Sequence, residues 1–107
     1  MHIVAETVID VASEYRRRIA TLPVEFAFVL YDHHRNTILF TTFFEDIDHA
    51  AEDQLAKIEG YMVDSFAEFL LDFRTIHLMG RDIAQFIPAG AIPLLPTRRS
   101  ELHRSAS

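Results

Sequence analysis

Histidines are the side chains in this sequence best suited to chemistry, because imidazole can bind a metal ion or exchange a proton near neutral pH. Two of them, His33 and His34, are neighbours inside a polar run at 32–36. His49 follows an acidic run, and His77 lies between two apolar residues. The candidate ligand-binding residues are therefore His33, His34, His49 and His77.

The spacing around these histidines predicts no metal ion, no cofactor and no catalytic residue. His49 and Asp53 are four residues apart, which places both on one side of a helix. The second histidine of a zinc-protease helix and the glycine of a calcium loop are missing. A general base at His77 would need a carboxylate partner, and local spacing supplies none. The chain has no cysteine, which excludes thiolate metal sites and cysteine nucleophiles.

Hydrophobic periodicity predicts the elements that position these side chains. Apolar residues at spacings of three and four predict two helices, and runs rich in β-branched and aromatic residues predict three strands. An apolar segment broken by prolines follows them, and it cannot form a helix or a central strand. The expected elements are a helix at 3–20, strands at 24–31 and 37–44, a helix at 47–72, a strand at 74–79, a helical turn at 82–86 and an extended arm at 87–96.

This order predicts an α+β fold, in which a small, mainly antiparallel sheet carries both helices on one face and ends in the apolar Pro-rich arm. A chain of 107 residues forms one domain, which we assign to 1–96. The polar, Arg-rich tail at 97–107 is expected to fray. No apolar run approaches about 20 residues, so we expect no membrane span. The first residues lack a basic leader, and we expect a cytoplasmic protein.

The two strands of the hairpin have more apolar surface than two helices can cover. Pairing Tyr31 with Thr37 sets a register in which one face is almost wholly apolar and lies under the helices. The residues of that face are Val24, Phe26, Phe28, Leu30, Ile38, Phe40, Thr42 and Phe44. The large apolar residues of the opposite face are Val29, Tyr31, Leu39 and Phe43. We predict that this second face, the apolar arm, or both contact another copy of the chain. The alternative is that the apolar arm covers it within one chain.

The net charge of −6 is concentrated in one segment. Nine of the 16 acidic residues lie at 45–72, where Lys57 is the single cation. Such a surface repels phosphate, so we expect no nucleic-acid partner. Asp53, Asp64 and Glu68 share the solvent side of the predicted helix, and they form a candidate surface for a basic protein partner. A solvated helix face without a partner is the alternative.

Taken together, these features favour a small cytoplasmic homodimeric interaction or regulatory domain over an enzyme. One alternative is a small-molecule-binding protein or small enzyme with a cavity between the sheet and the long helix. Another is an antitoxin or immunity-type protein that neutralises a basic partner through its acidic helix.

Overall fold

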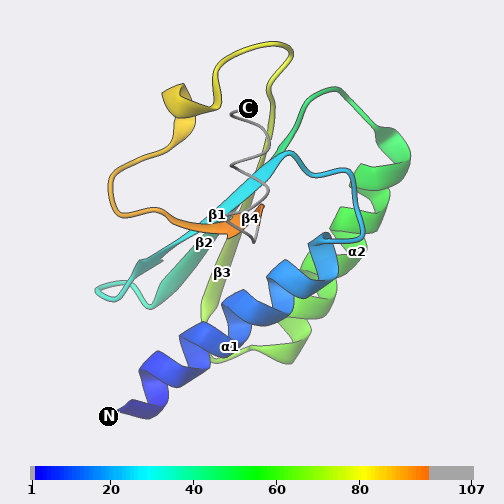
Figure 1. Cartoon of the computed structure of the whole chain (residues 1–107). Coiled ribbons are helices and arrows are strands. Elements are labelled where there is room, and N and C mark those ends of the chain that lie inside the picture. Colours follow the sequence, from blue (N-terminus) through cyan, green and yellow to red (C-terminus); the bar gives the residue numbers. More distant parts are fainter. Residues whose placement is uncertain (1, 97–107) are drawn as a thin grey trace.

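The computed structural model describes residues 2–96, and the tail predicted at 97–107 lies outside the described residues. The elements, in chain order, are α1 (His2–Ile19), β1 (Phe26–Asp32), β2 (Thr37–Phe44), α2 (His49–Ser65), β3 (Leu70–His77), the 3₁₀ turn η1 (Ile83–Phe86) and β4 (Ile92–Leu95) (Figure 1). The predicted α+β class is confirmed. No helix within residues 2–96 has the length and apolarity that crossing a membrane requires.

The strands form a single mixed sheet in the order β3-β2-β1-β4. β1 runs antiparallel to both of its neighbours, β2 and β4. β3 runs parallel to β2, because α2 carries the chain back along the sheet before β3 begins. The predicted arm therefore supplies the edge strand β4, a position in which Pro93 is tolerated because an edge strand needs hydrogen bonds on one side only.

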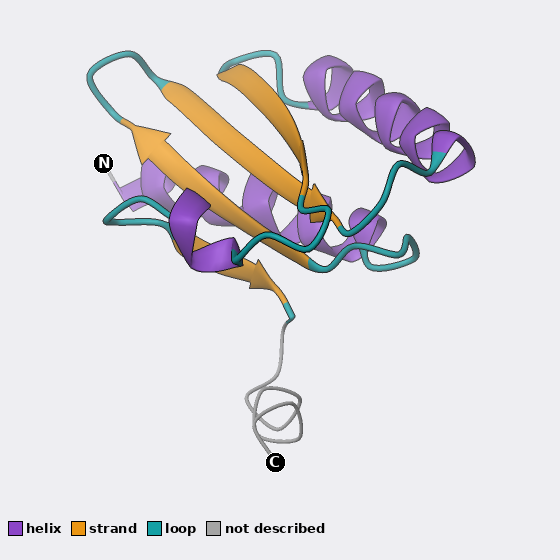
Figure 2. Ribbon diagram, turned by 90° about the horizontal axis from the view of Figure 1, so that it is seen from above, coloured by secondary structure: helices purple, strands orange, loops and turns teal. Residues whose placement is uncertain are grey.

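The main core lies between the helices and one face of the sheet. Val11, Tyr15 and Ile19 recur every four residues on α1, and all three are buried. Leu55 and Met62 of α2 belong to the same core. Figure 2 shows α1 lying across the strands and α2 on the β3 side of the sheet. Leu55 and Met62 pack against the sheet on this side.

The hairpin register differs by one residue from the prediction. Asp32 pairs with Thr37, and Tyr31 therefore lies opposite Ile38. The cause is the side chain of Asp32, which accepts a hydrogen bond from the backbone N–H of His34 (3.1 Å). This Asx turn starts the loop one residue later than the sequence pattern indicates.

The shift separates the four residues that were predicted to share a face. Val29 and Tyr31 lie on the face that the helices cover, and Val29 is buried there. Leu39 and Phe43 lie on the opposite face, because a one-residue slip turns each side chain to the other side. The prediction of one shared contact face is therefore wrong.

The chain covers part of the opposite face with its own C-terminal segment. Phe28, Phe43 and Leu78 form a second, smaller core. Ile83 and Phe86 of η1 pack against it, with 6.0 Å between the ring centroids of Phe43 and Phe86. Phe43 is fully buried as a result. The chain itself therefore covers this part of the face, with Ile83 and Phe86 of η1 and with Ala91 of the predicted arm.

α2 is shorter than predicted, and β3 is correspondingly longer. The helix ends at Phe66, which has a φ of −128° and donates its N–H to the C=O of Met62 (3.0 Å). Phe73 continues the apolar spacing of the helix, but it reaches the core together with Leu71, at the two-residue period of a strand. The predicted strand at 74–79 therefore starts at Leu70.

Candidate functional site

The loop between β1 and β2 holds His33 and His34 at the surface, and side-chain hydrogen bonds fix its backbone. Asn36 has a left-handed φ of 51°. Its Oδ1 accepts a hydrogen bond from the Tyr31 hydroxyl (3.0 Å), and its Nδ2 donates one to the C=O of Glu68 (2.9 Å). The two imidazole rings lie 4.2 Å apart, measured between centroids. The loop therefore presents two neighbouring aromatic rings.

A hollow of about 560 Å³ adjoins these rings, and we call it the hairpin hollow. Leu30 and Leu39 lie directly opposite each other on β1 and β2, and both line it. Asp72 and Arg74 line it from β3. The sequence pointed to His33, His34 and Leu39, but it missed Asp72 and Arg74, which reach the hollow only because β3 pairs with β2.

His77 has a carboxylate partner that its neighbours in the sequence do not supply. Its Nε2 lies 2.8 Å from Oε2 of Glu52, in the first turn of α2. Glu52 also accepts the backbone N–H of Asp48 (3.1 Å). The hydrogen bond from His77, and then that from Asp48, lowers the pKa of Glu52. The Glu52 carboxylate thus binds both the backbone at the start of α2 and the His77 imidazole on β3. We therefore assign the Glu52–His77 pair a structural role, which is to hold β3 against α2.

His49 begins α2 and is exposed beside an acidic loop. Asp48 caps the helix by accepting the N–H of Ala51 (3.0 Å). Glu45 and Asp46 line a hollow of about 410 Å³ with His49. Among the side chains that the structure describes, at residues 8–96, no three or more His, Asp or Glu are placed to share a metal ion.

The acidic surface predicted for the long helix is split by the early end of α2. Asp53 and Asp64 are exposed on the helix, about three turns apart on one side. Glu68 lies in the loop beyond Ser65, so the prediction that it shares their helix face is wrong. Binding of a basic partner stays a prediction.

An apolar groove of about 200 Å³ runs between α1 and β4, and no sequence pattern predicted it. Ile9 and Ile92 line the groove and are 62% and 59% exposed. The other residues that line it are Val8, Ala12, Ser13, Arg16, Val29, Tyr31 and Leu94. The groove brings residue 92 beside the first helix, a contact between the two ends of the described chain that no local pattern encodes.

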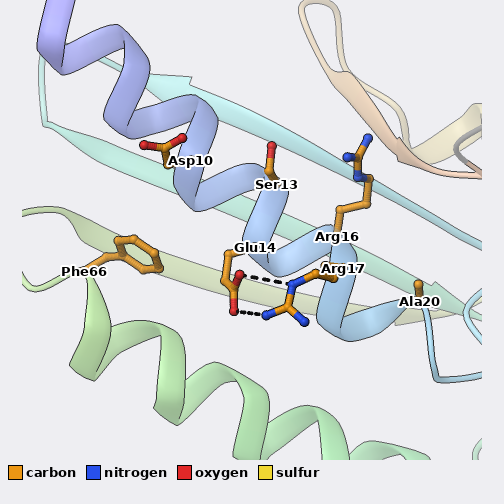
Figure 3. A pocket seen from close by; sticks show the side chains of 7 residues that line it. All are labelled: Asp10, Ser13, Glu14, Arg16, Arg17, Ala20 and Phe66. Carbon is orange, nitrogen blue, oxygen red and sulfur yellow. Dashed lines mark hydrogen bonds and ion pairs between the residues drawn. The ribbon is translucent and has the colours of Figure 1, made fainter.

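Figure 3 shows Glu14 and Arg17 on the side of α1 that faces α2. Glu14 and Arg17 form an ion pair there (2.6 Å). Arg18 also binds Glu14 (2.6 Å), and its guanidinium lies 3.6 Å from the centroid of the Tyr61 ring on α2. The hydrogen bonds from Arg17 and Arg18 lower the pKa of Glu14. Of these contacts, the one between Arg18 and Tyr61 joins the two helices.

Comparisons of this chain with models of protein families, with curated proteins and with solved structures found no match.

Proposed function

We propose that this chain is a self-associating interaction domain, and that its partner is a second copy packed on the surface between α1 and β4. We call this surface the α1–β4 face and define it by Ile9, Ser13, Arg16 and Ile92. The observation that carries the proposal is the apolar groove with two large, exposed isoleucines along it.

The apolar groove favours association because it leaves hydrophobic surface in water. Ile9 and Ile92 are both more than half exposed, although they lie beside buried Val29 and Leu94. Burying one such side chain completely contributes roughly 1.5–3 kcal/mol. A second copy that inserts its own Ile9 and Ile92 removes four such side chains from water at once. Two-fold pairing is the commonest arrangement that achieves this.

Charges along α1 favour a second copy over an unrelated partner. Asp10, Ser13 and Arg16 follow one another at a spacing of three, so they form one ridge on the helix. When two such ridges align about a two-fold axis through Ser13, Asp10 of each copy comes opposite Arg16 of the other. Ser13 is small, which lets the helices approach closely. Figure 3 shows Ser13 and Arg16 pointing away from α2, where a second copy has access.

Pairing of β4 edge to edge is the less favourable way to associate. Pro93 lies in the middle of this four-residue strand and has no N–H to donate. The side chains of the α1–β4 face therefore provide the contact in this proposal.

Sedimentation equilibrium across a wide range of protein concentration tests the proposal. Wild type is expected to be a dimer, and Ile9→Glu to be a folded monomer with an unchanged circular dichroism spectrum. Val63→Glu is the matched control, because Val63 is a 49% exposed apolar residue on α2, away from this face. A wild-type monomer at high concentration, or equal weakening by both variants, would refute the proposal.

A charge swap tests the two-fold geometry itself. Asp10→Arg alone and Arg16→Asp alone each bring like charges together in the dimer and should weaken it. The double variant restores opposite charges and should recover most of the wild-type dimer affinity. A double variant that is weaker than both single variants would contradict the alignment through Ser13.

A further inference from the structure

We propose that the hairpin hollow binds a small zwitterion that carries an aromatic ring, which is the chemistry of a free aromatic amino acid. The inference does not rest on self-association, because the hollow opens on the sheet face opposite the helices, whereas the α1–β4 face lies on the helix side.

The covered and uncovered parts of this sheet face define the hollow. Phe26 and Phe43 pair at one end of the face and lie under η1. Leu30 and Leu39 pair at the hairpin end and are half-buried, and Leu30 also packs against the second core. Both side chains line the hollow, so the leucine pair offers an apolar floor at the hairpin end.

The floor and the loop together favour a flat ring. An aromatic ring lying on Leu30 and Leu39 buries apolar surface on one side. The neighbouring imidazoles of His33 and His34 stand beside it and offer ring faces or edges for aromatic contacts. The backbone that carries them is held by the Tyr31–Asn36 and Asn36–Glu68 hydrogen bonds, so little ordering is needed on binding.

Two opposite charges on β3 set the polar part of the ligand. Asp72 and Arg74 are two residues apart in the strand, so they project from the same face at roughly 7 Å spacing between Cα atoms. Neither side chain forms an ion pair with another side chain of residues 8–96. Arg74 can donate two N–H groups to a ligand carboxylate, and Asp72 can accept hydrogen bonds from a ligand ammonium group.

The other charges of the hollow do not compete for these groups. Asp32 accepts the backbone N–H groups of His34 and Arg35, and its second oxygen lies 3.9 Å from the Arg35 guanidinium. The charges of Asp32 and Arg35 offset each other. Among the described residues that line the hollow, Arg74 and Asp72 are then the one cation and the one anion left to bind a ligand. A ligand with a single positive and a single negative charge matches it best.

Four probes separate these contributions when titrated into ¹⁵N-labelled protein and followed by NMR. L-phenylalanine has all three groups, N-acetyl-L-phenylalanine lacks the ammonium, L-phenylalaninamide lacks the carboxylate, and L-alanine lacks the ring. L-phenylalanine should bind most tightly, with saturable shifts at Leu39, Asp72 and Arg74. Loss of either charged group should weaken binding about tenfold, as expected for one charged hydrogen-bonding contact at a partly exposed site.

Variants assign each charge to its residue. Arg74→Gln should weaken L-phenylalanine about tenfold and leave L-phenylalaninamide unchanged. Asp72→Asn should weaken L-phenylalanine by a similar factor and leave N-acetyl-L-phenylalanine unchanged. Both residues are exposed, so neither change should unfold the protein. Lys57→Gln on α2 removes the same charge as Arg74→Gln and serves as the control.

Three results would overturn the inference. They are equal affinities for all four probes, shifts centred on Ile9 and Ile92 instead of the hairpin hollow, and the absence of saturable binding at millimolar L-phenylalanine. Because the probes act on the sheet face away from α1, a failure here leaves the self-association proposal standing.

Discussion

The hydrogen bond between Tyr15 and Thr42 should behave as a strongly coupled pair in the core. The Tyr15 hydroxyl lies 2.7 Å from Oγ1 of Thr42, and the two residues are 1% and 0% exposed. Tyr15→Phe removes the hydroxyl but keeps the ring, which packs 4.3 Å from Phe40 and 5.6 Å from Phe73 between centroids. The substitution therefore isolates the hydrogen bond from the aromatic packing.

The size of the effect follows from what each single change leaves behind. Tyr15→Phe leaves the Thr42 hydroxyl buried without its hydrogen-bond partner. Thr42→Val leaves the Tyr15 hydroxyl buried without its partner in the same way. Each should lower the free energy of unfolding by about 1–3 kcal/mol, the cost of a buried group that has lost its hydrogen bond. The double variant leaves neither group behind, so its loss should be smaller than the sum of the single losses by about 1–2 kcal/mol.

Urea unfolding followed by far-ultraviolet circular dichroism measures all four free energies; the chain has no tryptophan to report by fluorescence. Additive losses, with no coupling between the two sites, would refute the assigned role of this bond. Alkaline pH gives an independent check. Burial raises the pKa of Tyr15 above its ordinary value of 10, so its contribution to stability is complete below pH 10 and is lost as pH rises further. Tyr15→Phe should lack this part of the alkaline destabilisation.

Three further changes test other parts of the fold by urea unfolding. Glu52→Gln should lower the free energy of unfolding by about 1 kcal/mol at neutral pH, because it weakens the bond to His77. The pKa of Glu52 is lowered from 4.5 in the folded state, so the difference from wild type should persist above pH 4.5 and vanish as acid protonates the carboxyl; a constant difference would contradict the assignment. Gly60→Ala should raise stability by about 1 kcal/mol, because Gly60 is exposed within α2 and an added Cβ meets no atom within 4 Å; a loss would show that the helix is irregular there. Phe86→Ala should cost about 2 kcal/mol by uncovering Phe43, and an unchanged midpoint would mean that η1 does not cover the sheet.

The register of the hairpin shows where sequence reasoning ends for this chain. Both faces of β1 and β2 are apolar, so either register gives an acceptable pattern, and only the Asx turn at Asp32 selects one. The end of α2 is a similar case. Phe66, Phe69 and Phe73 keep a helical spacing, but the first ends the helix and the last lies in a strand. Short apolar runs fit both periods, and tertiary contacts decide between them.

The candidate sites divide in the same way. His33, His34 and Leu39 are close in the hairpin, so the sequence could place them together. Arg74 joins them through strand pairing, and Glu52 reaches His77 across 25 residues. The spacing of nearby residues does not predict contacts between residues so far apart in the sequence. Arg74 and Glu52 were missed for this reason.

The position of β4 determines when the sheet can be completed during synthesis. β1 is a central strand, yet its second neighbour is the last element of the described chain. Until residues 92–95 leave the ribosome, one edge of β1 has unpaired N–H and C=O groups beside the groove of α1. An open strand edge next to apolar surface is the usual starting point of aggregation. The last strand therefore protects the nascent protein, and loss of this short segment should harm solubility more than its four residues suggest.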